Sequence, residues 1–125
     1  MKKFYIFFAF LIIIGINFNV HAQLTGTKTI PGTYATLTVA ITDLNAQGVG
    51  GGGVTFNVAA GYTEMASNLV IAFTINAPTA ANQVIFQKSG AGANPLITAA
   101  PGVSVSFDGI IKLSGTDYIT FNGID

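Results

Sequence analysis

Apolar and polar residues alternate in Val54-Thr55-Phe56-Asn57-Val58, which is the period of a β-strand with one buried face. At the centre of this stretch an aliphatic residue is followed by one spacer and a Phe, and this unit occurs five times. The five units are Val54-Thr55-Phe56, Ile71-Ala72-Phe73, Val84-Ile85-Phe86, Val105-Ser106-Phe107 and Ile119-Thr120-Phe121. Two consecutive units together advance by roughly 30–35 residues, within the range of periods that repeat proteins show.

The recurring units predict an all-β chain, for which two architectures compete. In a β-solenoid, stacked turns of the chain place like side chains above one another, so the phenylalanines would form a ladder. Its members would be Phe56, Phe73, Phe86, Phe107 and Phe121. In an ordinary β-sandwich, buried Phe is equally common. The spacing of the units alone leaves both architectures open.

One stretch, residues 33–48, has the periodicity of a helix. Its apolar side chains recur at i, i+3, i+7 and i+10, and they are Tyr34, Leu37, Ile41 and Leu44. Thr33 can cap the N-terminus, and Gly48 can follow the C-terminus. Several β-branched residues oppose a helix here. The pattern nevertheless favours a short amphipathic helix.

The first 22 residues have the order of a secretory signal peptide. Lys2 and Lys3 give a positive start, and an apolar run extends from Phe4 to Ile16. Small residues then precede a cut between Ala22 and Gln23. The apolar run, about 13 residues, is shorter than the roughly 20 that span a bilayer. We therefore predict a signal peptide over residues 1–22 and an exported domain over residues 23–125, with an uncleaved membrane anchor as the alternative.

The composition excludes several classes of protein. Charged residues make up 8% of the chain, and five basic residues balance five acidic ones. A chain so poor in positive charge does not bind nucleic acid through its phosphates. The absence of Cys excludes a disulfide framework and a thiolate zinc site. Without residues 1–22 the chain also lacks His and Arg, which removes the base of a Ser-His-Asp or Cys-His site.

The carboxylates offer little basis for catalysis. Glycosidase chemistry needs two acids about 5–10 Å apart, and each candidate here has a structural explanation. Asp43 lies on the polar side of the predicted helix, Asp108 and Asp117 stand at turns, and Glu64 ends a Gly-Tyr-Thr-Glu turn, where we expect it to bond local backbone. No acidic cluster of the kind that calcium needs is visible in the sequence. We therefore predict no catalytic, cofactor-binding or metal site.

Two segments resemble right-handed parallel β-helix proteins of the pectin methylesterase and pectate lyase-like family. Residues 34–64, which end in Gly61-Tyr62-Thr63-Glu64, are similar to the N-terminal cap of these proteins. Residues 114–125, with Tyr118-Ile119-Thr120-Phe121-Asn122-Gly123, resemble one of their coil units. The resemblance implies a right-handed parallel β-helix that opens with a capping helix, whose covering face would be Tyr34, Leu37, Ile41 and Leu44. The catalytic aspartates and arginine of the pectin methylesterases have no counterpart here.

The sequence therefore indicates a secreted or cell-surface β-helix segment with a structural, adhesive or glycan-contacting role. A polysaccharide or cell-surface glycan is the expected partner, and Tyr62 and Tyr118 are candidate platforms for sugar rings. The alternative role is the non-catalytic front of a β-helix polysaccharide lyase or carbohydrate esterase. We also expect the chain to be the front of a longer protein, marginally stable by itself and prone to associate through an open C-terminal edge.

Overall fold

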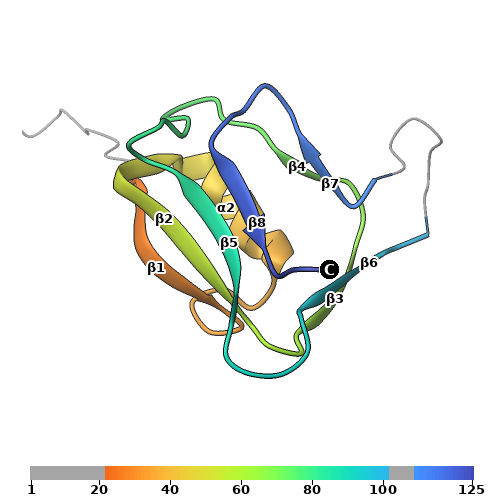
Figure 1. The fold of residues 1–125 in the computed structure, drawn as a ribbon. Helices are drawn as coiled ribbons and strands as arrows, with labels where there is room; N and C mark the ends of the chain where they lie inside the picture. Colours follow the sequence, from red (N-terminus) through yellow and green to blue (C-terminus); the bar gives the residue numbers. More distant parts are fainter. Residues whose placement is uncertain (1–21, 102–108) are drawn as a thin grey trace, which may run out of the picture.

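A computed structural model describes residues 22–101 and 109–125 (Figure 1). Its elements are β1 (Leu24–Ile30), α2 (Leu37–Gln47), β2 (Val49–Ala59), β3 (Thr63–Ala66), β4 (Leu69–Ile71), β5 (Val84–Ser89), β6 (Leu96–Ala99), β7 (Ile111–Leu113) and β8 (Ile119–Asn122). The prediction of a mainly β chain with one short helix is confirmed. The predicted signal peptide, apart from Ala22, and the unit that ends at Phe107 lie outside the described residues.

The strands form three sheets, and every pair of neighbouring strands within them is parallel. The first sheet has the order β1-β2-β5-β8, the second pairs β3 with β6, and the third pairs β4 with β7. From β2 onward, the chain therefore visits the three sheets in a fixed rotation. It places β2 in the first sheet, β3 in the second and β4 in the third. It then repeats this order with β5, β6 and β7, and returns to the first sheet with β8 (Figure 1).

Three of the five predicted ladder phenylalanines stack on one another. Phe56, Phe86 and Phe121 occupy matching positions in β2, β5 and β8. The ring centroids of Phe56 and Phe86 are 4.6 Å apart, those of Phe86 and Phe121 are 5.0 Å apart, and the ring planes are tilted by only 10° and 7°. Such stacking adds about 0.5–1.5 kcal/mol per pair to the free energy gained by burying the rings.

Phe73 does not belong to this stack, which corrects the five-membered ladder. Its unit begins in β4, in a different sheet, and Phe73 itself follows the end of that strand. The ring is half-buried against the core. Ile71, the aliphatic member of the unit, is the residue that fills the interior there, with no exposed surface.

The helix begins later than the sequence predicted. Its N-cap is Thr36, whose hydroxyl accepts the Val39 N–H at 3.1 Å. Thr33 does not take this role, because its hydroxyl accepts the Thr29 N–H at 3.2 Å in the preceding turn. Tyr34 therefore lies before the helix. The C-terminal prediction was right, because Gly48 has a φ of 70°, which favours glycine, and donates its N–H to the Leu44 carbonyl.

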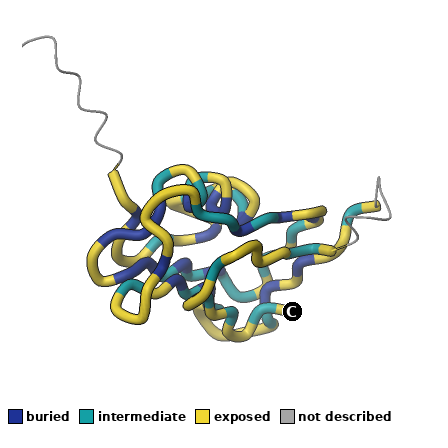
Figure 2. The backbone as a smooth tube through the Cα atoms, turned by 90° about the horizontal axis from the view of Figure 1, so that it is seen from above, coloured by how far each residue is buried: buried dark blue, intermediate teal, exposed yellow. Residues whose placement is uncertain are grey.

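The core lies between the helix and the inner faces of the sheets. The helix contributes Leu37, Ala40, Ile41 and Leu44, all buried, and its β-branched residues Thr38, Val39 and Thr42 face solvent. From Val54 to the end of β2 the buried residues alternate with half-buried ones, as the sequence period predicted. Figure 2 shows buried, intermediate and exposed stretches following one another along the backbone.

Candidate functional site

Within residues 22–101 and 109–125, no three His, Cys, Asp or Glu side chains come together in a way that could hold a metal ion. In the same part of the chain no helix is long and apolar enough to cross a membrane. The candidate carboxylates must therefore be considered one at a time.

Glu64 is the most heavily engaged carboxylate, and its partners differ from those predicted. It accepts the backbone N–H groups of Leu37 at 2.7 Å and Thr38 at 3.1 Å, in the first turn of α2. It also accepts the Thr38 hydroxyl and, at 2.7 Å, the Tyr62 hydroxyl. The sequence suggested a bond to local backbone. Instead, the carboxylate of β3 caps a helix 27 residues earlier in the chain.

These bonds set the protonation of both side chains. Desolvation by burial acts to raise the pKa of Glu64, but the hydrogen bonds from Thr38, Tyr62 and the Leu37 and Thr38 N–H groups outweigh it and lower that pKa. Burial, with the hydrogen bond to Glu64 and the charge of its carboxylate, raises the pKa of Tyr62 to about 12. Glu64 is therefore a fixed anion beside the N-terminus of a helix, where negative charge is favourable.

Asp43 also has a structural role. The Tyr34 hydroxyl donates to its carboxylate at 2.5 Å, and the Gln47 side-chain amide donates to the other carboxylate oxygen. Burial is the main cause that raises the pKa of Tyr34, followed by the bond to Asp43. The Tyr34 ring lies 5.9 Å from that of Phe56. Tyr34 thus joins the turn before α2 to both the helix and the phenylalanine stack.

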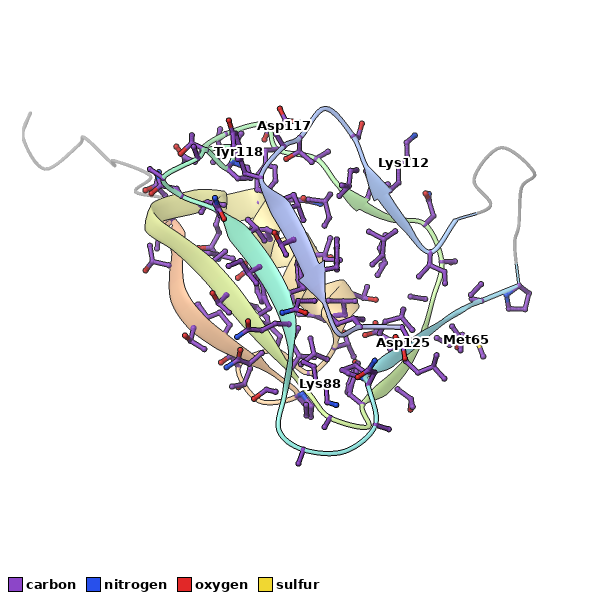
Figure 3. The ribbon with its side chains drawn as sticks, viewed as in Figure 1. Met65, Lys88, Lys112, Asp117, Tyr118 and Asp125 are labelled. Atoms are coloured by element: carbon purple, nitrogen blue, oxygen red, sulfur yellow. The ribbon has the colours of Figure 1, made fainter. Side chains whose placement is uncertain are left out.

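The two candidate sugar-stacking tyrosines lie in different settings. Tyr62 precedes β3, is half-buried, and has its hydroxyl bonded to Glu64. Tyr118 precedes β8 and is 50% exposed, with a φ of 58°. Its backbone carbonyl accepts the Val84 N–H at 3.1 Å. Of the two, only Tyr118 has half of its surface exposed to solvent. Figure 3 shows its place before β8.

The strand edges next to the helix are closed. In the first sheet, β1 pairs with the edge of β2 that β5 leaves open. In the third sheet, the Asn45 side chain of α2 donates to the Val70 carbonyl at 2.7 Å and accepts the Ala72 N–H at 3.0 Å. On either side of Val70, the backbone groups of Leu69 and Ile71 form hydrogen bonds on the opposite edge, toward β7. One amide side chain thus takes the place of a neighbouring strand at the other edge of β4.

The outer edges of β8 and β7 are open in the described residues, since β8 pairs only with β5 and β7 pairs only with β4. The outer edge of β6 is bonded to Asp125, which accepts the Ile97 N–H at 2.8 Å and donates to the Pro95 carbonyl at 2.9 Å. Beside these strands lies an apolar hollow of about 190 Å³, whose lining is Ile97, Ile110, Ile111, Phe121, Ile124 and Asp125. Leu96 and Leu113 are 45% and 48% exposed on the neighbouring strands. We call this surface, formed by β8, β7 and the hollow, the open end.

The outward face of the first sheet carries uncharged groups, which are polar in both central rows except at Ile85. One row of aligned residues is Thr27, Thr55, Ile85 and Thr120, and the next row is Thr29, Asn57, Gln87 and Asn122. The Gln87 amide donates to the Asn57 side chain at 2.9 Å across the strands. Neither row contains a charged side chain.

No protein-family model matches this chain, and no curated protein or solved structure shows significant similarity to it.

Proposed function

We propose that this chain forms the helix-capped end of a right-handed parallel β-helix, exported from the cell, with a structural and glycan-contacting role. The rotation of strands among three parallel sheets carries the proposal. In a β-helix each turn of the chain adds one strand to each sheet, and β2–β3–β4 followed by β5–β6–β7 is the order that two turns produce. The return of β8 to the first sheet begins a third turn.

The phenylalanine stack supports the same architecture. Residues at equal positions on successive turns of a β-helix lie directly above one another, and Phe56, Phe86 and Phe121 are partners in register. Their separations along the chain fall in the range that the sequence units predict. A β-sandwich would bury phenylalanines equally well, but it is built largely from antiparallel strands, whereas all the strand pairs in these sheets are parallel.

The closed end has the properties of a cap. An uncovered end of a β-helix presents unpaired backbone groups and an apolar cross-section, which invite uncontrolled pairing with other chains. Here β1, the Asn45 side chain and the buried face of α2 cover these groups. Glu64 fixes the first turn of the helix against β3. These residues hold the fold together, which favours a structural role over catalysis.

The polar rows favour contact with a neutral glycan. Hydroxyl and amide side chains exchange hydrogen bonds with sugar hydroxyls, and a face without charge has no preference for anionic polymers. The exposed ring of Tyr118 precedes the strand that carries Thr120 and Asn122. The signal-like residues 1–22 favour export, which would bring this face to extracellular polysaccharides.

The proposal is tested by export and by sedimentation with insoluble polysaccharides. We expect a secreted chain that begins at Gln23 and that sediments with a neutral polymer more than with polygalacturonate. Gln87→Glu, which charges the polar row, should reduce this binding at least threefold. Lys112→Gln, on β7, is a charge-changing control in another sheet. Retention in the cell, or equal binding by the Gln87 variant, would contradict the proposed role.

A further inference from the structure

The outer edge of β8 has the properties of a binding site for one more strand. We propose that the open end binds an extended peptide segment, parallel to β8, in which an aliphatic residue, one spacer, a Phe and an amide residue follow one another. This inference rests on the proposed function, since it takes the β2-β5-β8 stack as a structure that grows by whole strands. It goes further by specifying the chemistry and register of the next strand.

The backbone of β8 leaves hydrogen-bonding groups on its outer edge. The Val84 N–H of β5 donates to the Tyr118 carbonyl at 3.1 Å, and Val84 is aligned with Ile119. Alternate residues of a parallel strand direct their peptide groups to opposite edges. The peptide groups of Ile119 and Phe121 therefore point away from β5. No strand pairs with them in the described residues.

The side chains of β8 define what a new strand must carry. Ile119 continues a row of Val54 and Val84, and Phe121 continues the row of stacked rings. On the outward face, Asn122 follows Asn57 and Gln87, whose side chains are hydrogen-bonded to each other. A strand with an aliphatic residue, a Phe and an amide at these three positions would extend each row by one member.

The hollow at the open end offers room for the new aromatic ring. Its lining includes Phe121 and four isoleucines, and its volume is about 190 Å³. Apolar cavities of about 150 Å³ in other proteins take up benzene. A ring stacked on the free side of Phe121 would fill this space, as Phe121 itself covers Phe86. Leu96 and Leu113, half-exposed beside the hollow, would gain cover from the same segment.

A second copy of the folded chain fits this edge less well than a free segment. The units in which an amide residue follows the Phe are those of Phe56, Phe86 and Phe121, and in each copy they are already paired within the sheet, as β2, β5 and β8. The edge of β2 that would meet β8 in a head-to-tail arrangement is covered by β1. The occupant is therefore an extended segment that has not yet been incorporated into a sheet, bound by strand addition.

A labelled peptide that copies residues 116–125 tests the inference. Added to the purified chain, it should give saturable fluorescence anisotropy, and the amide exchange of Ile119 and Phe121 should slow at least tenfold. A peptide with its Phe replaced by Asp should bind at least tenfold more weakly. A peptide in which the backbone N–H groups that face β8 are methylated should also bind at least tenfold more weakly. Val39→Asp, on the exposed face of the capping helix, should leave binding unchanged.

The outcomes separate this inference from the proposed function. Thr120 and Asn122 direct their peptide groups toward β5, so slow exchange of their amides reports the β5-β8 pairing itself. If these two amides are protected but the peptide does not bind, the inference is wrong and the β-helix proposal stands. If they exchange freely, both are wrong. If the chain self-associates and thereby displaces the peptide, the occupant is a second copy and the inference is overturned.

Discussion

The Glu64 carboxylate accepts the Leu37 N–H at 2.7 Å, and this bond joins β3 to the first turn of α2. The first N–H groups of a helix have no partners within the helix. A side chain of the helix's own N-cap usually satisfies one of them, and Thr36 does so for Val39. Glu64 satisfies two more from a different element. The helix is therefore fixed to the sheets by an anion at its positive end.

Replacing Glu64 with Gln should loosen this attachment. The amide keeps the size of the side chain but loses the charge and part of the accepting capacity. We expect Glu64→Gln to lower the free energy of unfolding by about 1–2 kcal/mol, measured by urea denaturation. Asp117→Asn, at an exposed turn, is the matched control and should change stability by less than about 0.5 kcal/mol. Equal stabilities of the two variants would contradict the role of Glu64.

The same carboxylate should make stability depend on pH in the acid range. Its pKa is below the ordinary value of 4.5 in the folded chain, so in that range the unfolded chain binds more protons. Stability from Glu64 is present above the unfolded pKa and is lost as the pH falls through the lower, folded pKa. We expect the urea midpoint of the parent chain to fall in this window more than that of Glu64→Gln. Parallel pH profiles of the two chains would show that Glu64 does not carry this dependence.

The middle ring of the phenylalanine stack should contribute most to stability. Phe86 is fully buried between Phe56 and Phe121. Phe86→Ala should therefore cost about 3–5 kcal/mol, enough to unfold a marginally stable domain. Phe86→Leu keeps most of the volume and should cost less. Phe73→Ala, at a half-buried site outside the stack, is the control. If the Phe73 variant is as destabilised as Phe86→Ala in the same measurement, the stack has no special role.

Asn45 and Asn122 provide a matched pair for the two ends of the molecule. Asn45→Ala would leave the Val70 carbonyl and the Ala72 N–H without their helix partner, at a cost of about 1–3 kcal/mol. Asn122 is exposed on β8, at the open end. Asn122→Ala should change stability by less than about 0.5 kcal/mol. Thermal unfolding of both variants checks this difference. A larger loss for Asn122 would contradict the assignment of closed and open ends.

Local patterns predicted much of the fold. The alternation around Phe56 and the helical spacing of Leu37, Ile41 and Leu44 depend only on near neighbours, and they fixed the types of these elements. The spacing of the units led to a predicted ladder of five phenylalanines, of which Phe56, Phe86 and Phe121 stack in register. Spacing could not show that the unit of Phe73 begins in another sheet, because the sheet that a strand joins depends on the turns around it.

The features of the candidate site were harder to predict. The bond from Leu37 to Glu64 spans 27 residues, as does that from Ala72 to Asn45. Both depend on how the helix lies across the sheets, which no local pattern encodes. The helix start was misplaced because Thr33 and Thr36 have the same capping chemistry. The turn bond between Thr29 and Thr33 decides between them. A single acid in an otherwise neutral turn is the only local signal that pointed to Glu64.

The most direct test of the β-helix proposal is a set of distances between outward-facing positions of the first sheet. Nitroxide labels on Thr55→Cys and Ile85→Cys would lie one strand spacing apart, about 5 Å, and labels on Thr55→Cys and Thr120→Cys two spacings apart, about 10 Å. We predict strong dipolar broadening of the electron paramagnetic resonance spectrum for the first pair and weaker but clear broadening for the second. If the second pair shows no broadening although the labelled chain still unfolds cooperatively, then β5 does not lie between β2 and β8 in one sheet. That result would contradict the β-helix proposal.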